Sequence, residues 1–184
     1  MKHYNLPSCV VVDPELDAAP AVVVYGGLYG WEGNWFLHRI PVSLQSELIF
    51  VLPQHYTNDC NACLKELHSK IETGKIKSYS LCGYSRGGIE VYRYRSLMTW
   101  KIYGLIDPSA PRMGGFTDDV LDSVKDKIRC VYNLANWAKA DYFPKIQSFH
   151  QDLLDIGAKM TDTDTPHDKM PKFFFDTYGS DFKT

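Results

Sequence analysis

The segment with the clearest chemical pattern is Gly83-Tyr84-Ser85-Arg86-Gly87, which fits G-x-S-x-G and is followed by Gly88. It lies between an apolar run that ends at Cys82 and a helical pattern that begins near Arg86. A strand-to-helix turn of this kind holds its serine in a strained conformation, and flanking glycines let the hydroxyl project because they carry no clashing side chain. The pattern therefore predicts Ser85 as a nucleophile. The alternative is a glycine-rich turn in another α/β protein.

A serine hydroxyl is a weak nucleophile and needs a general base, which is usually a histidine oriented by a carboxylate. His167 is the favoured base because it follows the last strand-like stretch, near residues 159–161, and opens the final helical pattern. Its alternative role is that of an exposed residue at a helix start. His38 and His55 remain possible cleft residues. The remaining histidines fall in the terminus or in helical patterns: His3, His68 and His150.

These side chains need a scaffold that brings distant segments together. Short apolar runs rich in β-branched or aromatic residues predict strands at residues 10–12, 21–25, 48–52, 79–82, 102–106 and 128–134. Helical patterns occupy residues 59–72, 86–99, 116–127, 143–156 and 167–177. Near-continuous hydrophobicity is typical of parallel strands that are covered on both faces. We therefore expect an α/β fold: a doubly wound, mostly parallel central sheet of about six to seven strands, with helices on both faces and the site at the carboxyl ends of the strands.

The order of these motifs resembles the α/β-hydrolase superfamily over nearly the whole chain from Val22 onward. Residues 22–27, Val-Val-Val-Tyr-Gly-Gly, are similar to the family's strand and oxyanion loop, with Tyr25 in place of the usual histidine. Residues 83–88 look like its nucleophile elbow, and residues 167–171 look like the histidine that leads into the last helix. The short spacings are similar to those of the smallest members. The resemblance implies a single domain over residues 1–184 without an inserted lid.

In α/β-hydrolases the acid of the triad comes from a strand end between the nucleophile and the histidine. Two aspartates qualify. Asp107 follows the predicted strand 102–106 and precedes a proline, and its alternative role is a turn residue. Asp141 follows the predicted strand 128–134, and Asp141-x-x-Pro144 looks like the family's acid turn. We prefer Asp141 because it comes from the later strand, with Asp107 as the alternative acid.

The resemblance also implies an oxyanion hole and a binding cleft. The backbone N–H of Arg86 and that of Gly27 or Leu28 would stabilise the carbonyl oxygen as it becomes negative. The residues that would bind substrate along an open cleft are Tyr29, Trp31, Tyr84 and Met113. Aromatic residues of this kind often pack in a core instead. A cleft without a lid would suit a small ester or thioester.

Composition points to no other kind of partner. Twenty Lys plus Arg against twenty-two Asp plus Glu give a formal charge of −2, so no overall field selects for nucleic acid or an anionic membrane. No apolar run is long enough to span a bilayer, and the first residues lack a signal-peptide pattern. Five cysteines, an odd number, favour reduced thiols. We expect a cytoplasmic protein that uses no metal or other cofactor.

The leading hypothesis is a serine hydrolase that cleaves a carboxylic ester or thioester through an acyl-enzyme. In this hypothesis Ser85 attacks the carbonyl, His167 transfers the proton and Asp141 orients the imidazole. One alternative is a catalytically inactive protein of the same fold that binds or regulates, which the Tyr25 departure suggests. Another is an acyltransferase or thioesterase that acts on a carrier-bound acyl group with the same triad.

Overall fold

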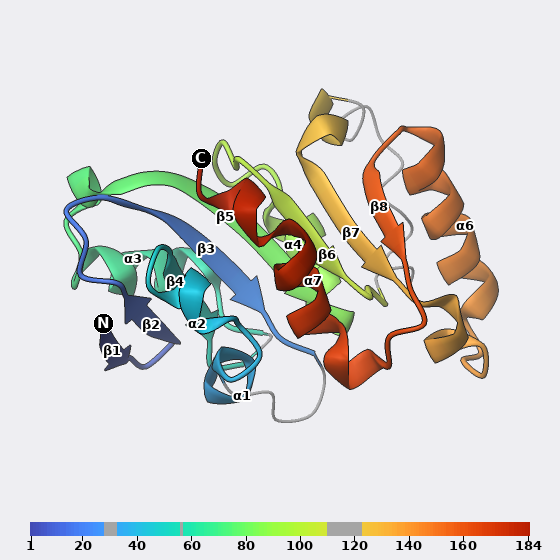
Figure 1. Cartoon of the computed structure of the whole chain (residues 1–184), viewed down its shortest axis with the longest axis horizontal. Coiled ribbons are helices and arrows are strands. Elements are labelled where there is room, and N and C mark those ends of the chain that lie inside the picture. Colours follow the sequence, from blue (N-terminus) through green and yellow to red (C-terminus); the bar gives the residue numbers. More distant parts are fainter. Residues whose placement is uncertain (28–32, 56, 110–122) are drawn as a thin grey trace.

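A single eight-stranded sheet forms the centre of the protein. The computed structural model describes residues 1–27, 33–55, 57–109 and 123–184. The strand order is β1-β2-β4-β3-β5-β6-β7-β8 (Figure 1). β2 pairs antiparallel with β1 and β4, whereas every pair from β4 to β8 is parallel. The strands other than β2 therefore end at the same edge, which is where α/β sheets bind ligands.

The elements alternate along the chain between strands and helices. The strands are β1 (Lys2–Asn5), β2 (Cys9–Asp13), β3 (Ala19–Tyr25), β4 (Ile49–Pro53), β5 (Ile76–Tyr84), β6 (Tyr103–Ile106), β7 (Ile128–Tyr132) and β8 (Lys159–Asp162). The α-helices are α1 (Gly33–Leu37), α2 (Val42–Gln45), α3 (Cys60–His68), α4 (Gly88–Tyr94), α6 (Phe143–Asp155) and α7 (Met170–Tyr178). Short 3₁₀ turns span Thr73–Lys75, Ser85–Gly87, Lys125–Lys127, Leu134–Trp137, His167–Lys169 and Gly179–Phe182.

The sheet is covered on both faces by apolar helix surfaces. Val23 and Tyr25 of β3 pack in a core with residues of α3, α4 and α6, whereas Val22 and Val24 pack in a second core with residues of α1, α2 and α7. Figure 1 shows α7 in front of the sheet. All seven residues of β3 are buried. This double coverage explains why the strands read as unbroken apolar runs, because each buried aliphatic side chain stabilises the fold by about 1.5–3 kcal/mol.

The doubly wound, mostly parallel α/β fold is confirmed, with three differences in detail. The sheet has eight strands rather than six to seven, because the polar segment Lys2–Asn5 pairs with β2 as an edge strand. Helices α1 and α2 were not predicted, since four or five residues are too few to show a helical period. The predicted helix 86–99 begins with a 3₁₀ turn and its α-helix ends at Tyr94. Most of the predicted helix 116–127 lies outside the described residues.

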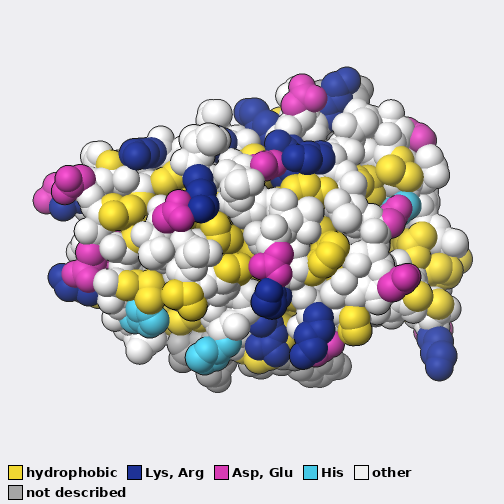
Figure 2. All heavy atoms as spheres, in the orientation of Figure 1, with side chains coloured by type: hydrophobic (Ala, Val, Ile, Leu, Met, Phe, Trp, Pro, Cys, Tyr) yellow, Lys and Arg dark blue, Asp and Glu magenta, His cyan; other side chains and the backbone are white. Residues whose placement is uncertain are grey.

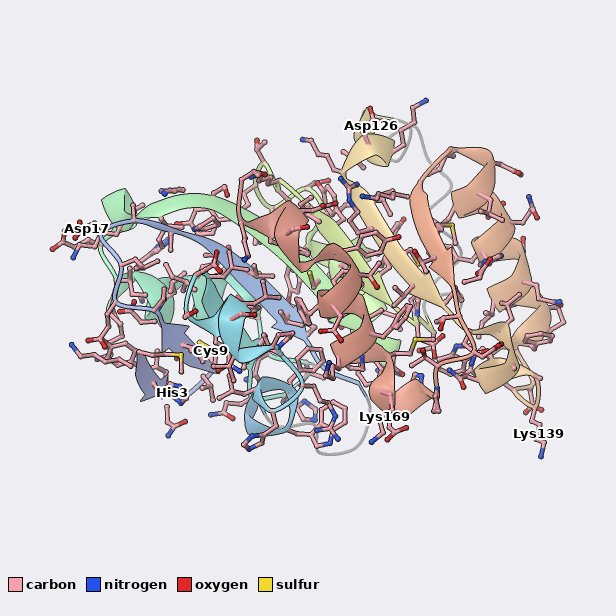
Figure 3. All side chains as sticks on the ribbon, viewed as in Figure 1. His3, Cys9, Asp17, Asp126, Lys139 and Lys169 are labelled. Atoms are coloured by element: carbon pink, nitrogen blue, oxygen red, sulfur yellow. The ribbon has the colours of Figure 1, made fainter. Side chains whose placement is uncertain are left out.

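Lys169 and Asp126 mark the two opposite ends of the strands. Lys169, in the turn before α7, lies at the end where the strands finish, and Asp126, just before β7, lies at the opposite end (Figure 3). On the face that carries α7, acidic and basic side chains are interspersed in small groups (Figure 2). All five cysteines are buried and free. No described helix is both long and apolar enough to cross a membrane.

Candidate active site

Ser85 occupies a strained turn between β5 and α4. It begins the 3₁₀ turn Ser85–Gly87 with a φ of +54°, in the left-handed region that a residue with a side chain rarely adopts. Such a conformation costs about 1–3 kcal/mol and persists only where the surroundings hold it. The predicted strand-turn-helix context of Ser85 is therefore present.

The glycines on either side of Ser85 are required by close backbone approach. A Cβ at Gly83 would overlap the carbonyl group of Gly87. A Cβ at Gly87 would lie 2.5 Å from the carbonyl oxygen of Tyr25 and 2.6 Å from that of Gly26. The turn therefore packs directly against the end of β3 at Gly87 and folds back on itself at Gly83, and no side chain fits at either position.

Asp107 is a fully buried carboxylate at the end of β6 that is surrounded by hydrogen-bond donors. Its Oδ2 lies 2.6 Å from His167 Nδ1 and accepts from Asn136 Nδ2 at 2.7 Å. Its Oδ1 accepts from Trp137 Nε1 at 3.0 Å and from the backbone N–H of Asn133 at 3.2 Å. Four donors compensate for the loss of water around the charge. Because a carboxylate only accepts, Nδ1 of His167 carries a proton, and in the neutral form of the imidazole Nε2 is an acceptor.

The segment that follows Asp107 is tied to the turn of Ser85. The backbone N–H of Ser109 donates to the carbonyl oxygen of Ser85 at 3.0 Å. Asp107 itself has a φ of +42°, so Ser85 and Asp107 are both non-glycine residues in left-handed conformations. Strained residues of this kind cluster at functional sites. Ser85 and the Asp107–His167 pair lie at the ends of the neighbouring strands β5 and β6, at the carboxyl edge of the sheet.

His167 stands in a 3₁₀ turn that leads directly into α7. Met170 and Pro171 begin the helix, and proline is favoured in a first helical turn because its missing N–H would lack a partner there. The carbonyl oxygen of Thr165, two residues before His167, accepts from Asn133 Nδ2 at 2.9 Å and from Asn136 Nδ2 at 3.4 Å. The His167 side chain is 34% exposed, so the imidazole reaches solvent while its acid does not.

Two aromatic rings flank the imidazole. The Tyr84 ring stacks on it with centroids 4.7 Å apart, and the Tyr84 hydroxyl donates to the carbonyl oxygen of His167 at 3.0 Å. Trp137 meets the imidazole in an edge geometry at 4.9 Å. Burial raises the pKa of the Tyr84 phenol, and Asp107 and Asp168 act in the same direction, so the hydroxyl keeps its proton as a donor.

The structure pairs His167 with Asp107, the alternative acid, and not with the preferred Asp141. Asp141 is exposed in the turn before α6 and, within the described part of the chain, has no hydrogen bond or ion pair with His167. The end of β7 supplies donors to the Asp107 carboxylate instead of a carboxylate to His167. Asn133, Asn136 and Trp137 all come from that end and all point at Asp107.

The other histidines lie in different surroundings. His150 pairs with Asp162 at 2.8 Å, and His68 contacts the Tyr79 hydroxyl at 2.8 Å. His55 lies 2.6 Å from the Thr57 hydroxyl, and His38 is exposed. Among described residues, Asp107 is the carboxylate that His167 contacts, and no other histidine is paired with it.

The structure tests only some of the predicted oxyanion and substrate residues. Gly27 follows β3 and is buried, and Arg86 is the second residue of the turn that packs against this strand end. Leu28, Tyr29, Trp31 and Met113 lie outside the described residues. Tyr84, predicted to bind substrate, is only 1% exposed and contacts His167 instead.

Sequence reasoning missed three residues that surround the acid: Asn133, Asn136 and Trp137. Their signal was the Asn-x-x-Asn-Trp stretch that directly follows an apolar run, because polar residues at a strand's carboxyl end lie at the binding edge. Within the part of the chain that the structure describes, no group of three or more His, Cys, Asp or Glu side chains is placed to hold a metal ion.

Comparisons of the sequence with protein-family models and with curated proteins find no match. Solved structures do match. Fluorophosphonate-binding serine hydrolase F of Staphylococcus aureus is 9% identical, with 100% of this chain and 97% of that chain covered and a TM-score of 0.65. A serine hydrolase without a lid from Xanthomonas campestris is 15% identical, covering 94% and 85%, with a TM-score of 0.63. Dienelactone hydrolase from Anabaena variabilis is 14% identical, covering 98% and 96%, with a TM-score of 0.62.

At these identities the likeness concerns the fold. The chain has the α/β-hydrolase fold, and the resemblance drawn from its motifs is confirmed at that level.

Proposed function

We propose that the protein is a serine hydrolase that cleaves a small carboxylic ester or thioester through an acyl-enzyme, with Ser85 as nucleophile, His167 as base and Asp107 as acid. The observation that carries the proposal is the buried Asp107 carboxylate 2.6 Å from His167 Nδ1, at the edge where Ser85 is held with a positive φ. Solved hydrolases of the same fold support it.

Each residue has a defined role in the reaction. The Ser85 oxygen bonds to the substrate carbonyl carbon while its proton passes to Nε2 of His167. Asp107 holds the Nδ1–H tautomer and stabilises the imidazolium that forms. The imidazolium then gives its proton to the leaving alkoxide or thiolate. Water repeats these steps on the acyl-enzyme and releases the carboxylic acid.

The oxyanion would be stabilised by backbone donors. The N–H of Arg86 follows the nucleophile in the turn, and Gly27 or Leu28 would supply the second donor from the segment after β3. Gly87 already lies against the carbonyls of Tyr25 and Gly26, which supports a close approach of the two segments. Losing one oxyanion donor typically costs about 2.7–4 kcal/mol of transition-state stabilisation.

The domain is proposed to carry no lid between β6 and β7. Residues 107–127 connect these strands, which is a short connection for an inserted domain. An open site favours small substrates or an acyl group with an accessible flank. The contact between Asp107 and His167 also supports the catalytic interpretation over the inactive alternative, because a carboxylate that orients a histidine is the arrangement a serine nucleophile needs.

The decisive experiment is labelling with a fluorophosphonate probe, followed by intact mass. The wild-type protein should gain one adduct and Ser85→Ala none. Ser80→Ala is the matched control: Ser80 is a buried serine on the same strand β5, and its hydroxyl has no hydrogen-bond partner among the described residues. That variant should label like the wild type. An unlabelled wild-type protein, or a labelled Ser85→Ala, would refute the proposal.

Short nitrophenyl esters and an acyl thioester of matched acyl length then separate the substrate classes. Comparable turnover of both supports a general acyl hydrolase. Turnover confined to the thioester would move the assignment to the thioesterase alternative with the same residues.

A further inference from the structure

Tyr84 makes two separate contacts with one residue, His167. Its hydroxyl donates to the His167 carbonyl oxygen at 3.0 Å, and its ring stacks on the imidazole with an interplanar angle of 30°. One contact fixes the backbone of His167 and the other limits rotation of its side chain. With the bond from Nδ1 to Asp107, His167 is held at three points, one on its backbone and two on its imidazole.

The position of Tyr84 is itself fixed by its surroundings. The ring is 1% exposed and packs in the core between the sheet and α7. The ring also stacks with Trp35 at 5.9 Å, and Phe36 meets it in an edge geometry at 6.0 Å. A ring held by Trp35 and Phe36 can restrict the position of the imidazole that it contacts, because packed aromatic side chains have little freedom to shift.

Tyr84 also connects the segment that carries Ser85 with the loop that carries His167. It directly precedes Ser85 at the end of β5, whereas His167 comes from the loop before α7. The carbonyl oxygens of Thr165 and His167, on either side of Pro166, are both held by side chains of other elements. The His167 loop is thereby clamped from β5 on one side and from the end of β7 on the other.

We infer that Tyr84 is a positioning residue for the general base, which aligns the His167 imidazole with Ser85, and that it is not a substrate-binding residue. This inference rests on the proposed function. Its burial keeps substrate from the ring, and its contacts run to the base. An imidazole that is free to shift by about 1 Å can lose about 10²-fold in rate.

Two substitutions separate the hydroxyl from the ring. Tyr84→Phe removes the bond to the His167 carbonyl and keeps the stack, so kcat should fall about threefold to tenfold. Tyr84→Leu removes both, so kcat should fall by about 10²-fold. In both variants KM for a short nitrophenyl ester should stay at the wild-type value. The rate constant for fluorophosphonate labelling should fall in parallel with kcat, because that reaction also needs the base.

Tyr103→Phe is the matched control. The Tyr103 hydroxyl also donates to a backbone carbonyl, that of Arg95, at 3.0 Å, but it lies at the start of β6, away from the site. Thermal unfolding should show a loss of stability of the same kind in Tyr103→Phe and Tyr84→Phe. Only the Tyr84 variant should lose kcat and labelling rate.

The outcomes distinguish this inference from the proposed function. Absence of labelling in the wild-type protein would overturn the proposed function itself. A wild type that labels, with Tyr84 variants that keep kcat and change KM, would make Tyr84 a substrate contact and refute the inference alone. Wild-type kcat and KM in Tyr84→Phe would refute it as well, whether or not Tyr84→Leu folds.

Discussion

Replacing Asp107 by asparagine tests the acid directly, because the carboxylate is buried and accepts from four donors. An asparagine side chain has one acceptor oxygen and one NH₂ group. If its oxygen replaces Oδ2, the NH₂ faces the Trp137 indole and the Asn133 amide. If it is turned over, the NH₂ faces His167 and Asn136. The first orientation leaves two buried donors without an acceptor, whereas in the second His167 can move its proton to Nε2 and Asn136 keeps its bond to Thr165.

Asp107→Asn should lower both the stability of the protein and its kcat. Each unpaired buried donor costs about 1–3 kcal/mol, so the first orientation would lower the free energy of unfolding by about 2–6 kcal/mol and the second by less. For a chain of this size each kcal/mol lowers Tm by about 2–4 °C. The kinetic loss has a separate cause, because an amide at this position no longer enforces the Nδ1–H tautomer of His167. A comparable change in a Ser-His-Asp triad costs about 10⁴-fold in kcat, which we expect for Asp107→Asn.

The assay compares Asp107→Asn with Asp141→Asn on a short nitrophenyl ester, well below the thermal midpoint of each variant. Asp141 is exposed, so its variant should keep both Tm and kcat near the wild-type values. A larger loss of kcat in Asp141→Asn would refute the reasoning from His167 and restore the sequence-based preference. So would a folded Asp107→Asn with wild-type kcat.

Three further predictions follow from named contacts. Gly87→Ala should abolish fluorophosphonate labelling and lower the unfolding free energy by about 1–3 kcal/mol, because its Cβ would lie 2.5 Å from a carbonyl oxygen of β3. Gly74→Ala is its control, since a Cβ there meets nothing within 4 Å. Asn136→Ala removes a donor from Asp107 and from the His167 loop, so kcat should fall about tenfold while the ester KM stays constant. Burial opposes ionisation of Asp181, but hydrogen bonds from Arg129 and Lys159 outweigh it and lower its pKa. The ionised Asp181 therefore stabilises the folded protein. This contribution is fully present above the pKa of the carboxyl group in the unfolded chain, and it is lost as pH falls through the lower pKa of the folded protein. Asp181→Asn should therefore lower Tm at about pH 7, with a difference that narrows as pH falls below about 4 in pH-dependent thermal unfolding.

The parts of the site that sequence predicted are those determined locally. The turn at Ser85 depends on residues two positions away on either side, since Gly83 and Gly87 must be glycine for this turn to form. The position of His167 before the last helix also follows from nearby residues. The fold class was predictable for a similar reason. A sheet that is covered on both faces makes each strand an unbroken apolar run, which can be recognised in the sequence strand by strand.

The choice of Asp107 as the proposed acid could not be made from the sequence, because it depends on three segments that are distant in the chain. Asp107 and Asp141 both follow a predicted strand, and chain order alone permits either. What separates them is how far the His167 loop reaches across the sheet edge. That loop is anchored by Asn133 and Asn136 through Thr165, and this anchor brings His167 to the end of β6.

The proposed acid is therefore better described as Asp107 together with the donors that hold it, which come from two neighbouring strand ends. β6 supplies the carboxylate of Asp107, and the end of β7 supplies three donors that hold it and two that hold the His167 loop. Asn136 belongs to both sets, so the charge and the base are positioned by one amide. Because such a unit joins groups some 30 to 60 residues apart, no spacing along the chain identifies it. A buried carboxylate needs donors as much as it needs a histidine. The polar residues that follow an apolar strand are thus evidence for the acid of the preceding strand, and in this chain they favour Asp107.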